Sequence, residues 1–225
     1  MRVLGLVGSR RRVGNTEILV KQALKAARDQ GAEVALIKLS DLNVQPCNGC
    51  MACMTKGEHC RLKDDMDFLG EEIAKSDGLV LGAPSYHYKP MGIFCLIDDR
   101  LHGLTLPKER RKMAVSIGTA GMLERSGWVV PMLNLFLRFT RHEIVGSLMA
   151  VSAGPGEVLF DGRDSLMKET YSLGTRLVDA LKDESTRIHG VDRFKIFDPR
   201  RKDGDKLYTP GYCCPYCFSE AFQFI

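Results

Sequence analysis

The sequence predicts an α/β protein built on a doubly wound parallel sheet, and three observations support this class. Five short apolar runs recur between residues 2 and 182, and amphipathic stretches separate them. The first run ends at Gly8 and the third at Pro84, two residue types that commonly end a buried strand. Strands that alternate with helices in this way form parallel sheets covered by helices on both faces.

The expected elements follow from the spacing of the apolar residues. Unbroken apolar runs favour five buried strands, at 3–7, 34–39, 79–83, 113–117 and 144–151. Apolar residues three or four positions apart indicate helices, at 16–30, around 66–73, and at 92–101, 128–140 and 165–182. The helix at 128–140 is apolar nearly all round, which predicts burial on several sides or cover by a second subunit.

The composition excludes several classes of function. The chain has 225 residues, of which 44% are hydrophobic and 27% charged, as in an ordinary globular protein. The densest basic runs, 10–12 and 199–202, contain no aromatic residues, so no nucleic-acid partner is expected. No apolar run approaches the ~20 residues that cross a bilayer, so no membrane partner is expected. Residues 1–8 do not form a signal peptide, which predicts a cytoplasmic protein.

The regular pattern predicts one domain and an appendage. Residues 1–182 are expected to form the α/β domain, with a cysteine-rich loop at 46–60. Residues 183–225 mix proline, glycine and charge with scattered aromatics, and have too few regular apolar positions to build a core. We therefore expect them to form a C-terminal arm, which carries a second group of cysteines.

A loop suited to phosphate follows the first predicted strand. In a doubly wound sheet, ligands bind beyond the carboxyl ends of the strands. Ser9 and Thr16 carry hydroxyl groups, Gly14 permits close approach of the backbone, and Arg11 adds positive charge. The N–H groups at the start of the next helix complete an anion site. We call residues 8–16 the phosphate loop.

Two nucleotide motifs are excluded at the phosphate loop, and one simpler interpretation stays open. The loop lacks the Gly-Lys-Ser/Thr ending of a P-loop and the G-x-G-x-x-G of a dinucleotide fingerprint. The simpler interpretation is a basic surface turn in which Asn15 or Thr16 only caps the helix.

Three loops together resemble the NADPH-dependent FMN reductase family of the flavodoxin-like superfamily. Gly8-Ser9-x-Arg11-x-x-Gly14-Asn15-Thr16 resembles its FMN phosphate loop, and the stretches 82–88 and 118–121 resemble the loops on either side of its flavin ring. The ending Asp98-Asp99-Arg100 is similar to the end of the family's third helix. The resemblance covers residues 2–182 and implies a flavodoxin-like five-stranded sheet. It implies that FMN is bound by Ser9, Arg11, Val13, Gly14, Asn15, Thr16, Pro84, Ser85, Tyr86, His87, Tyr88, Thr119, Ala120 and Gly121.

Residue chemistry supports a flavin slot independently. A flavin needs a partly aromatic slot with a few directed polar groups, and Tyr86 and Tyr88 supply ring-sized contact area. Backbone N–H groups of 85–88 or 119–121 are placed to steady the flavin's N1/O2 edge. The plainer interpretation is two half-buried tyrosines at a sheet edge. His87 is not assigned as an acid or a base.

The first cysteine group has the spacing C-x2-C-x2-C-x6-C. It consists of Cys47, Cys50, Cys53 and Cys60, and we call residues 46–60 the cysteine loop. Four thiolates in one loop favour a 4Fe–4S cluster, since zinc sites usually have two separated C-x2-C pairs. The motif also resembles that of the iron–sulfur flavoproteins, a branch of the same family. Zinc, and free or oxidised thiols in a lid over the flavin or at a dimer seam, remain alternatives.

The second cysteine group, Cys213, Cys214 and Cys217, has no assigned role. Its C-P-x-C turn resembles half of a metal knuckle, which would need further ligands from Cys95, His189 or a second subunit. Buried thiols and a dithiol relay are the other interpretations.

These features predict an FMN-dependent oxidoreductase in which the cofactor performs the chemistry. The expected electron donor is NAD(P)H or ferredoxin, and no catalytic side chain is assigned. A homodimer or homotetramer is expected, because neighbouring subunits complete the shallow flavin slot in similar proteins. The alternatives are a non-catalytic redox carrier or sensor that docks a partner protein, and a cluster-free NAD(P)H-dependent FMN or quinone reductase. A metal-binding module with an inorganic anion in the phosphate loop is a further alternative.

Overall fold

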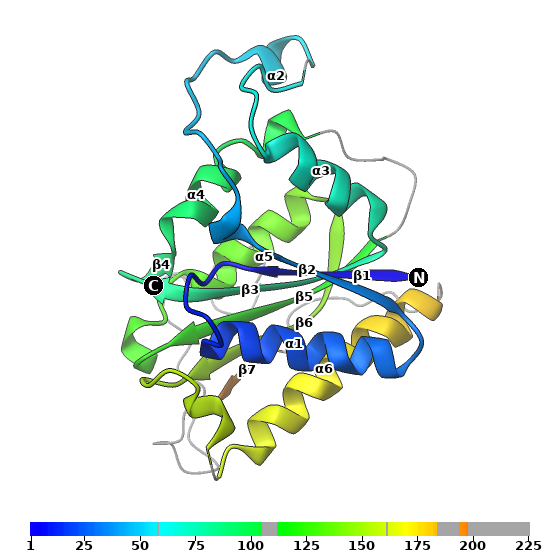
Figure 1. Ribbon diagram of the computed structural model, residues 1–225, viewed down its shortest axis with the longest axis vertical. Coiled ribbons are helices and arrows are strands. Elements are labelled where there is room, and N and C mark those ends of the chain that lie inside the picture. The colour runs from blue at the N-terminus through cyan, green and yellow to red at the C-terminus, as the bar shows by residue number, and fades with distance from the viewer. Residues whose placement is uncertain (58, 105–111, 161, 184–193, 198–225) are drawn as a thin grey trace, which may run out of the picture.

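The computed structural model describes residues 1–57, 59–104, 112–160, 162–183 and 194–197 (Figure 1). Cys213, Cys214 and Cys217 lie outside the described residues, so their role stays a prediction. No helix in the described ranges combines the length and the apolar character that crossing a bilayer requires.

A parallel sheet forms the centre of the molecule. Its strands lie in the order β2-β1-β3-β5-β6-β7, and each neighbouring pair is parallel. The first five long strands therefore follow the 2-1-3-4-5 order of flavodoxin-like sheets, which confirms the predicted fold class. The strands are β1 (Arg2–Val7), β2 (Glu33–Lys38), β3 (Gly78–Tyr86), β5 (Lys112–Ala120), β6 (His142–Val151) and β7 (Phe194–Phe197).

Helices cover both faces of the sheet and enclose two separate cores (Figure 1). One face is covered by α1 (Asn15–Asp29) and α6 (Asp164–Lys182). The other is covered by α3 (Met66–Lys75), α4 (Gly92–Asp98) and α5 (Val129–Phe139). The two helices of the first face touch at Gly174, where an added Cβ would lie 2.1 Å from the Ala23 carbonyl oxygen.

The third strand does not break at Pro84, as the sequence predicted. It continues to Tyr86 because Ser85 and Tyr86 leave the parallel sheet and pair with the short antiparallel strand β4 (Lys89–Pro90). Pairing in this hairpin replaces the parallel ladder at the point where proline offers no N–H group. The helix expected at 92–101 is also shorter than predicted, because it ends at Asp98 and a separate 3₁₀ turn, η2 (Leu101–Gly103), follows.

Strand β7 adds a sixth parallel strand that the sequence pattern did not predict. Its residues pair with Ser147 to Ala150 of β6 and extend the sheet at that edge. The segment lies within residues 183–225, which were expected to form a C-terminal arm. At least this part of the arm packs onto the domain.

Helix α5 has an apolar face that stays partly exposed in the described part of the chain. The sequence predicted burial on several sides, and the face toward the sheet is indeed buried. However, Leu135 is 38% exposed and Phe139 is 55% exposed, and Trp128 just before the helix is 41% exposed. This part of the prediction is therefore wrong for one copy of the chain.

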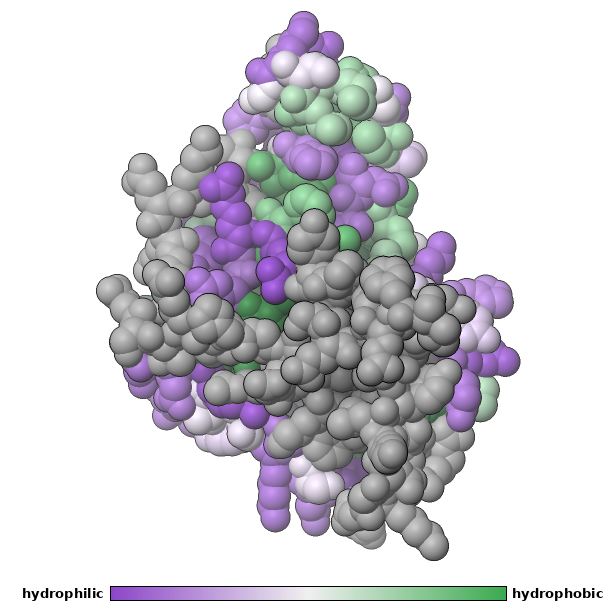
Figure 2. All heavy atoms as spheres, turned by 180° about the vertical axis from the view of Figure 1, so that it is seen from behind, coloured by the Kyte–Doolittle hydropathy of each residue, from purple (hydrophilic) through white to green (hydrophobic). Residues whose placement is uncertain are grey.

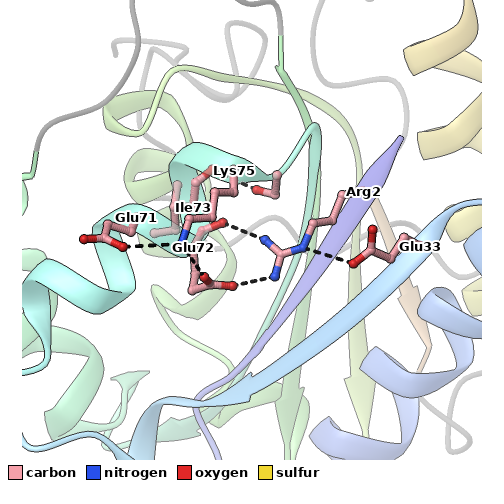
Figure 3. Close-up of polar contacts among 7 residues, drawn as sticks. Arg2, Glu33, Glu71, Glu72, Ile73 and Lys75 are labelled. Carbon is pink, nitrogen blue, oxygen red and sulfur yellow. Dashed lines mark hydrogen bonds and ion pairs between the residues drawn. The ribbon is translucent and has the colours of Figure 1, made fainter.

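Charged side chains tie the amino end of the sheet together (Figure 3). Arg2 of β1 donates to the carboxylate and the backbone carbonyl of Glu72 in α3, and its Nε lies 3.7 Å from Glu33 of β2. Lys75 contacts Glu71 and Glu72 from the other side of the same helix turn. A ligand is expected at the carboxyl ends of the strands. These ion pairs lie at the opposite edge of the sheet.

Candidate functional site

The phosphate loop connects β1 to α1 and leaves an anion seat at the helix start. Gly14 is the N-cap of α1 in extended conformation, and no side chain caps the helix. The first N–H groups of α1 therefore stay available to a ligand. Ser9 is buried, and its Oγ accepts the N–H of Arg11 at 3.3 Å. A Cβ at position 14 would lie 3.0 Å from Cβ of Arg11, so the loop closes tightly around glycine.

A buried ion pair fixes the outer half of this loop. The Glu17 carboxylate accepts the backbone N–H of Val13 at 3.3 Å and contacts Lys38 Nζ at 3.2 Å. Lys38, at the end of β2, also donates to the carbonyl of Arg11 at 3.3 Å. Burial alone would raise the pKa of Glu17, but hydrogen bonds from Lys21 and Lys38 lower it below its usual value. Two ammonium groups thus offset the one carboxylate close to the anion seat.

Asn15 and Thr16 connect the helix start to two other strands. Thr16 Oγ1 lies 2.7 Å from Thr119 Oγ1 at the end of β5. One of these two hydroxyl hydrogens stays available, because the bond between them uses only one. Asn15 donates to the Gly154 carbonyl at 2.8 Å, beyond the end of β6. Within the described residues, Asn15 Oδ1 and Ser152 Oγ are buried without a hydrogen-bond partner. Unsatisfied buried oxygens at one edge indicate a place for a polar ligand or water.

Residues 84–88, which we call the tyrosine loop, include the turn of a hairpin between β3 and β4. Two residues, His87 and Tyr88, connect the paired strands. His87 has φ 51° and Tyr88 has φ 67°, which matches the type I′ turn that joins tight hairpins. Both are left-handed without being glycine, a conformation that costs energy and is common at functional sites. Tyr86 and Tyr88 are each 50% exposed, so they present ring surface at the edge where ligands bind.

Neighbouring backbone holds the tyrosine loop in place. The Tyr88 carbonyl accepts the N–H of Trp128 at 2.6 Å, and the Ser85 hydroxyl donates to the carbonyl of Arg125. Gly127 has φ 50°, and a Cβ there would lie 2.3 Å from the Tyr88 carbonyl oxygen. Only glycine fits both the backbone conformation and the close approach.

The glycine loop, residues 118–121, follows at the end of β5. Thr119 and Ala120 are buried, whereas Gly121 is exposed. The Ala120 carbonyl accepts the N–H of Ser152, which joins this loop to the end of β6. The three predicted loops therefore lie at the carboxyl edge of the sheet, after β1, β3 and β5.

The four cysteines of the cysteine loop line a single pocket. The loop rises from the face that carries α3 and α4, at the top of Figure 1, and holds the short helix α2 (Ala52–Thr55). Its exposed surface includes the apolar side chains of Met51 and Met54, and Figure 2 shows hydrophobic and hydrophilic residues mixed at this end. The pocket is lined by Cys47, Cys50, Cys53 and Cys60, with further residues from α2, from the segment after the loop, and from 99–103.

The thiols do not form a ready-made metal site in this conformation. Among the described residues, no three His, Cys, Asp or Glu side chains are grouped as ligands of one metal ion. Cys47 and Cys50 are exposed, while Cys53 and Cys60 are half-buried. Cys60 is not held away by a continuous helix, because α2 ends at Thr55. The donor set of four cysteines and the pocket that they share fit a cluster.

Comparison with known proteins decides the family. A family model described as NADPH-dependent FMN reductase matches residues 1–156. The chain belongs to the NADPH-dependent FMN reductase family. An iron–sulfur flavoprotein of Methanocaldococcus jannaschii is 32% identical to this reductase over 140 residues, 61% of this chain and 72% of the relative. An iron–sulfur flavoprotein of Archaeoglobus fulgidus is 29% identical over 187 residues, 81% of each chain. A flavodoxin from the domain Archaea, 13% identical, matches the fold with a TM-score of 0.54 over 81% of this chain and 100% of that chain.

These matches confirm the predicted family and its iron–sulfur flavoprotein branch. The reductase is an FMN-dependent oxidoreductase, and FMN is its cofactor. The uncapped start of α1 and the buried hydroxyl of Ser9 fit a phosphate-bearing ligand. The tyrosines at the neighbouring strand end fit its ring.

Sequence reasoning missed the loop after β6. Ser152 and Gly154 contact Asn15, and Glu157 accepts the N–H of Gly154 at 2.7 Å and pairs with Arg163. The signal was present, because a run of serine, glycine and proline follows the fifth apolar strand. The loop after β6 lies at the carboxyl end of a parallel strand, where such loops build ligand sites.

Helix α4 separates the tyrosine loop from the cysteine pocket. The hairpin lies just before its first residue, Gly92, and the pocket is lined by Asp99 and Arg100 just after its end. A helix of 7 residues is about 10 Å long. The cysteine pocket is therefore connected to the tyrosine loop through one short helix.

Proposed function

We propose that this reductase passes electrons between FMN and a 4Fe–4S cluster held by Cys47, Cys50, Cys53 and Cys60. The observation that carries this proposal is the single pocket that all four cysteines line. Bound FMN exchanges electrons in pairs or singly, and a cluster exchanges them singly. The donor in this proposal is NAD(P)H or ferredoxin.

The residues of the chain supply position and electrostatics in this scheme. The N–H groups at the start of α1 and the hydroxyl of Ser9 hold the phosphate, and Arg11 adds a charge on the solvent side. The tyrosine and glycine loops bracket the ring, and their backbone N–H groups donate to its polar edge. The hydrogen bonds from Trp128 and Ser85 hold the tyrosine loop rigid for this task.

A spectrum with chemical analysis tests the whole proposal. Protein purified without oxygen is expected to show flavin bands above a broad absorbance, with iron and sulfide in a 1:1 ratio and four irons per chain. Protein that carries flavin but takes up no iron and sulfide on anaerobic reconstitution would contradict the cluster. Protein that neither retains nor takes up FMN would contradict the flavin site.

A pair of cysteine variants tests the pocket. Cys53→Ala removes a proposed ligand and is expected to abolish iron binding while FMN stays bound. Cys95→Ala is the matched control, because Cys95 lies outside the pocket and contacts the Pro90 carbonyl at 3.8 Å. Loss of both FMN and iron from Cys53→Ala would mean that the loop is chiefly a structural lid.

A charge variant tests the phosphate loop. Ser9→Glu with Thr16→Glu places negative charge at the anion seat and is expected to abolish FMN retention without unfolding the chain. Ser165→Glu is the control, since Ser165 is an exposed residue in the first turn of α6, another helix start. Comparison with riboflavin, which lacks the phosphate, separates charge repulsion from damage to the ring site. Equal FMN affinity in the variant and the wild type would refute the assignment.

A cluster-free NAD(P)H-dependent FMN or quinone reductase is the second candidate function. This function is favoured because the cysteine thiols of the described residues are not grouped as ligands of one metal ion. Steady NAD(P)H turnover by protein that contains flavin but no iron would support it. Ready reduction by ferredoxin without NAD(P)H turnover would favour a redox carrier instead.

We also propose that the reductase acts as a homodimer or homotetramer in the cytoplasm. The uncovered apolar residues of α5 and the half-exposed tyrosines support an assembly. Sedimentation at micromolar concentration tests this, and a monomer would contradict it.

A further inference from the structure

Arg100 is a buried cation at the wall of the cysteine pocket. It follows helix α4 and is only 3% exposed. Its Nη2 donates to Sγ of Cys60 at 3.1 Å, and its Nη1 donates to the Gln45 carbonyl at 3.0 Å and to the carboxylate of Asp64. One guanidinium therefore reaches a cysteine and the chain on both sides of the cysteine loop.

We propose that Arg100 is a positioning residue for the cluster: it fixes Cys60 at the pocket and raises the reduction potential through its hydrogen bond to that sulfur. This inference rests on the proposed cluster. It goes beyond the four cysteines, because it assigns a specific role to a side chain that the ligand spacing does not identify.

The first argument is that Arg100 closes the foot of the loop. Asp64 accepts the backbone N–H of Gln45 at 2.7 Å while it pairs with Arg100. Asp65 accepts the backbone N–H of Asn43 at 2.7 Å, and its own N–H donates to the carbonyl of Asn43. The planar guanidinium of Arg100 contacts Cys60, Gln45 and Asp64 at the same time. A lysine ammonium does not reproduce this geometry.

The second argument is that two residues, Arg100 and Gly103, contact Cys60 closely. Besides the contact with Arg100, a Cβ on Gly103 of η2 would lie 2.8 Å from Cβ of Cys60. The backbone at 103 thus packs directly against the cysteine and leaves little space for it to move. Cys60 is half-buried and held by a side-chain hydrogen bond from Arg100, whereas Cys47 and Cys50 are exposed.

The third argument is electrostatic. Each electron that a loaded site accepts adds negative charge, and hydrogen bonds to cluster sulfurs together with nearby cations make that charge less costly. The buried Asp64 carboxylate pairs with Arg100 and offsets its charge. The hydrogen bond to Cys60 is therefore the main contribution of Arg100 that raises the potential.

Two variants disturb the hydrogen bond to Cys60 without leaving an unpaired charge buried. Arg100→Lys keeps the charge but not the fork, so it weakens either the contact to Cys60 or the contact to Asp64. Arg100→Gln with Asp64→Asn removes both charges together, so no carboxylate is left buried without a partner. The control is Arg2→Lys, since Arg2 also bridges several acceptors but lies at the opposite edge of the sheet.

The experiment uses full-length protein purified or reconstituted without oxygen. Iron, sulfide and FMN are assayed, and the midpoint potentials of cluster and flavin are measured by redox titration with visible and paramagnetic resonance spectra. Both Arg100 variants are expected to lower the cluster potential while the flavin potential and the control stay at the wild-type values.

The outcomes distinguish the inference from the function on which it rests. Wild-type protein without iron refutes the proposed cluster, and this inference with it. Iron at wild-type level with an unchanged cluster potential in both Arg100 variants refutes this inference alone. A lowered cluster potential in both Arg100 variants supports the inference. Loss of iron from either variant, with FMN retained, also supports the positioning role.

Discussion

A buried histidine makes the stability of this protein depend on pH, and His142→Leu tests the reasoning. His142 begins β6 and is 3% exposed. Its Nδ1 lies 3.1 Å from the Thr140 hydroxyl, and its Nε2 has no hydrogen-bond partner among the described residues. Burial, together with the positive charge of Lys112 on the adjacent strand, lowers the pKa of His142 to about 3.

The sign follows from linkage. The folded state holds His142 neutral, whereas an unfolded chain protonates it near pH 6.5. The unfolded state therefore binds the extra proton as pH falls from about 6.5 toward 3, and stability is lost over that window. At 1.36 kcal/mol per pH unit, acidification from pH 7 to 5 costs about 2 kcal/mol. For a chain of this size that is a fall in Tm of about 4–8 °C.

Urea unfolding at pH 7 and pH 5 measures this loss. Leucine fills a similar volume but does not titrate. Between pH 7 and pH 5, His142→Leu is therefore expected to lose about 2 kcal/mol less unfolding free energy than the wild type loses. His102→Gln is the control, because His102 is exposed and contacts the Phe139 ring edge-on. A leucine variant that loses as much stability as the wild type between the two pH values would refute the assignment.

Two further predictions concern stability. Burial and the neighbouring Asp99 raise the pKa of Asp98 to about 6, so stability is lost as pH rises from about 4 through 6. Asp98→Asn is expected to add about 1–2 kcal/mol at pH 7, allowing for partial solvent screening, and equal unfolding free energies would contradict this. Gly174→Ala is expected to destabilise the folded protein by ~1–3 kcal/mol or more, because the new methyl group pushes α6 away from α1. Gly92→Ala is the control, since a Cβ there meets open space. Equal melting temperatures of the two variants would contradict this prediction.

The sheet and the anion seat could be predicted because both depend on local pattern. Apolar runs mark buried strands, and the glycine at position 14 marks the start of a helix that faces a ligand. The β3–β4 hairpin could not be predicted in this way. Its turn residues, His87 and Tyr88, are not the asparagine and glycine that usually signal a type I′ turn. The position depends instead on Trp128 and Gly127, which are distant in the sequence.

The cysteine pocket shows the same division. Spacing alone grouped Cys47, Cys50, Cys53 and Cys60, because residues so close in the chain share one loop. The partner of Cys60 was not predictable, since Arg100 comes from a helix end 40 positions away. Strand β7 was missed because it is only 4 residues long and lies among charged residues and prolines. Contacts of this kind depend on tertiary packing, which no local pattern records.

The clamp of Asp64 and Arg100 also divides the molecule into a rigid part and a part that opens by local unfolding. Above the clamp, Ala52 alone is buried among the described residues of the cysteine loop, so few apolar contacts oppose opening. Below it, the two cores remain intact. Amide exchange in metal-free protein is therefore fast in the loop and slow in the sheet. We therefore expect the proposed cluster to be exchangeable through local opening of the loop, while the two cores stay folded.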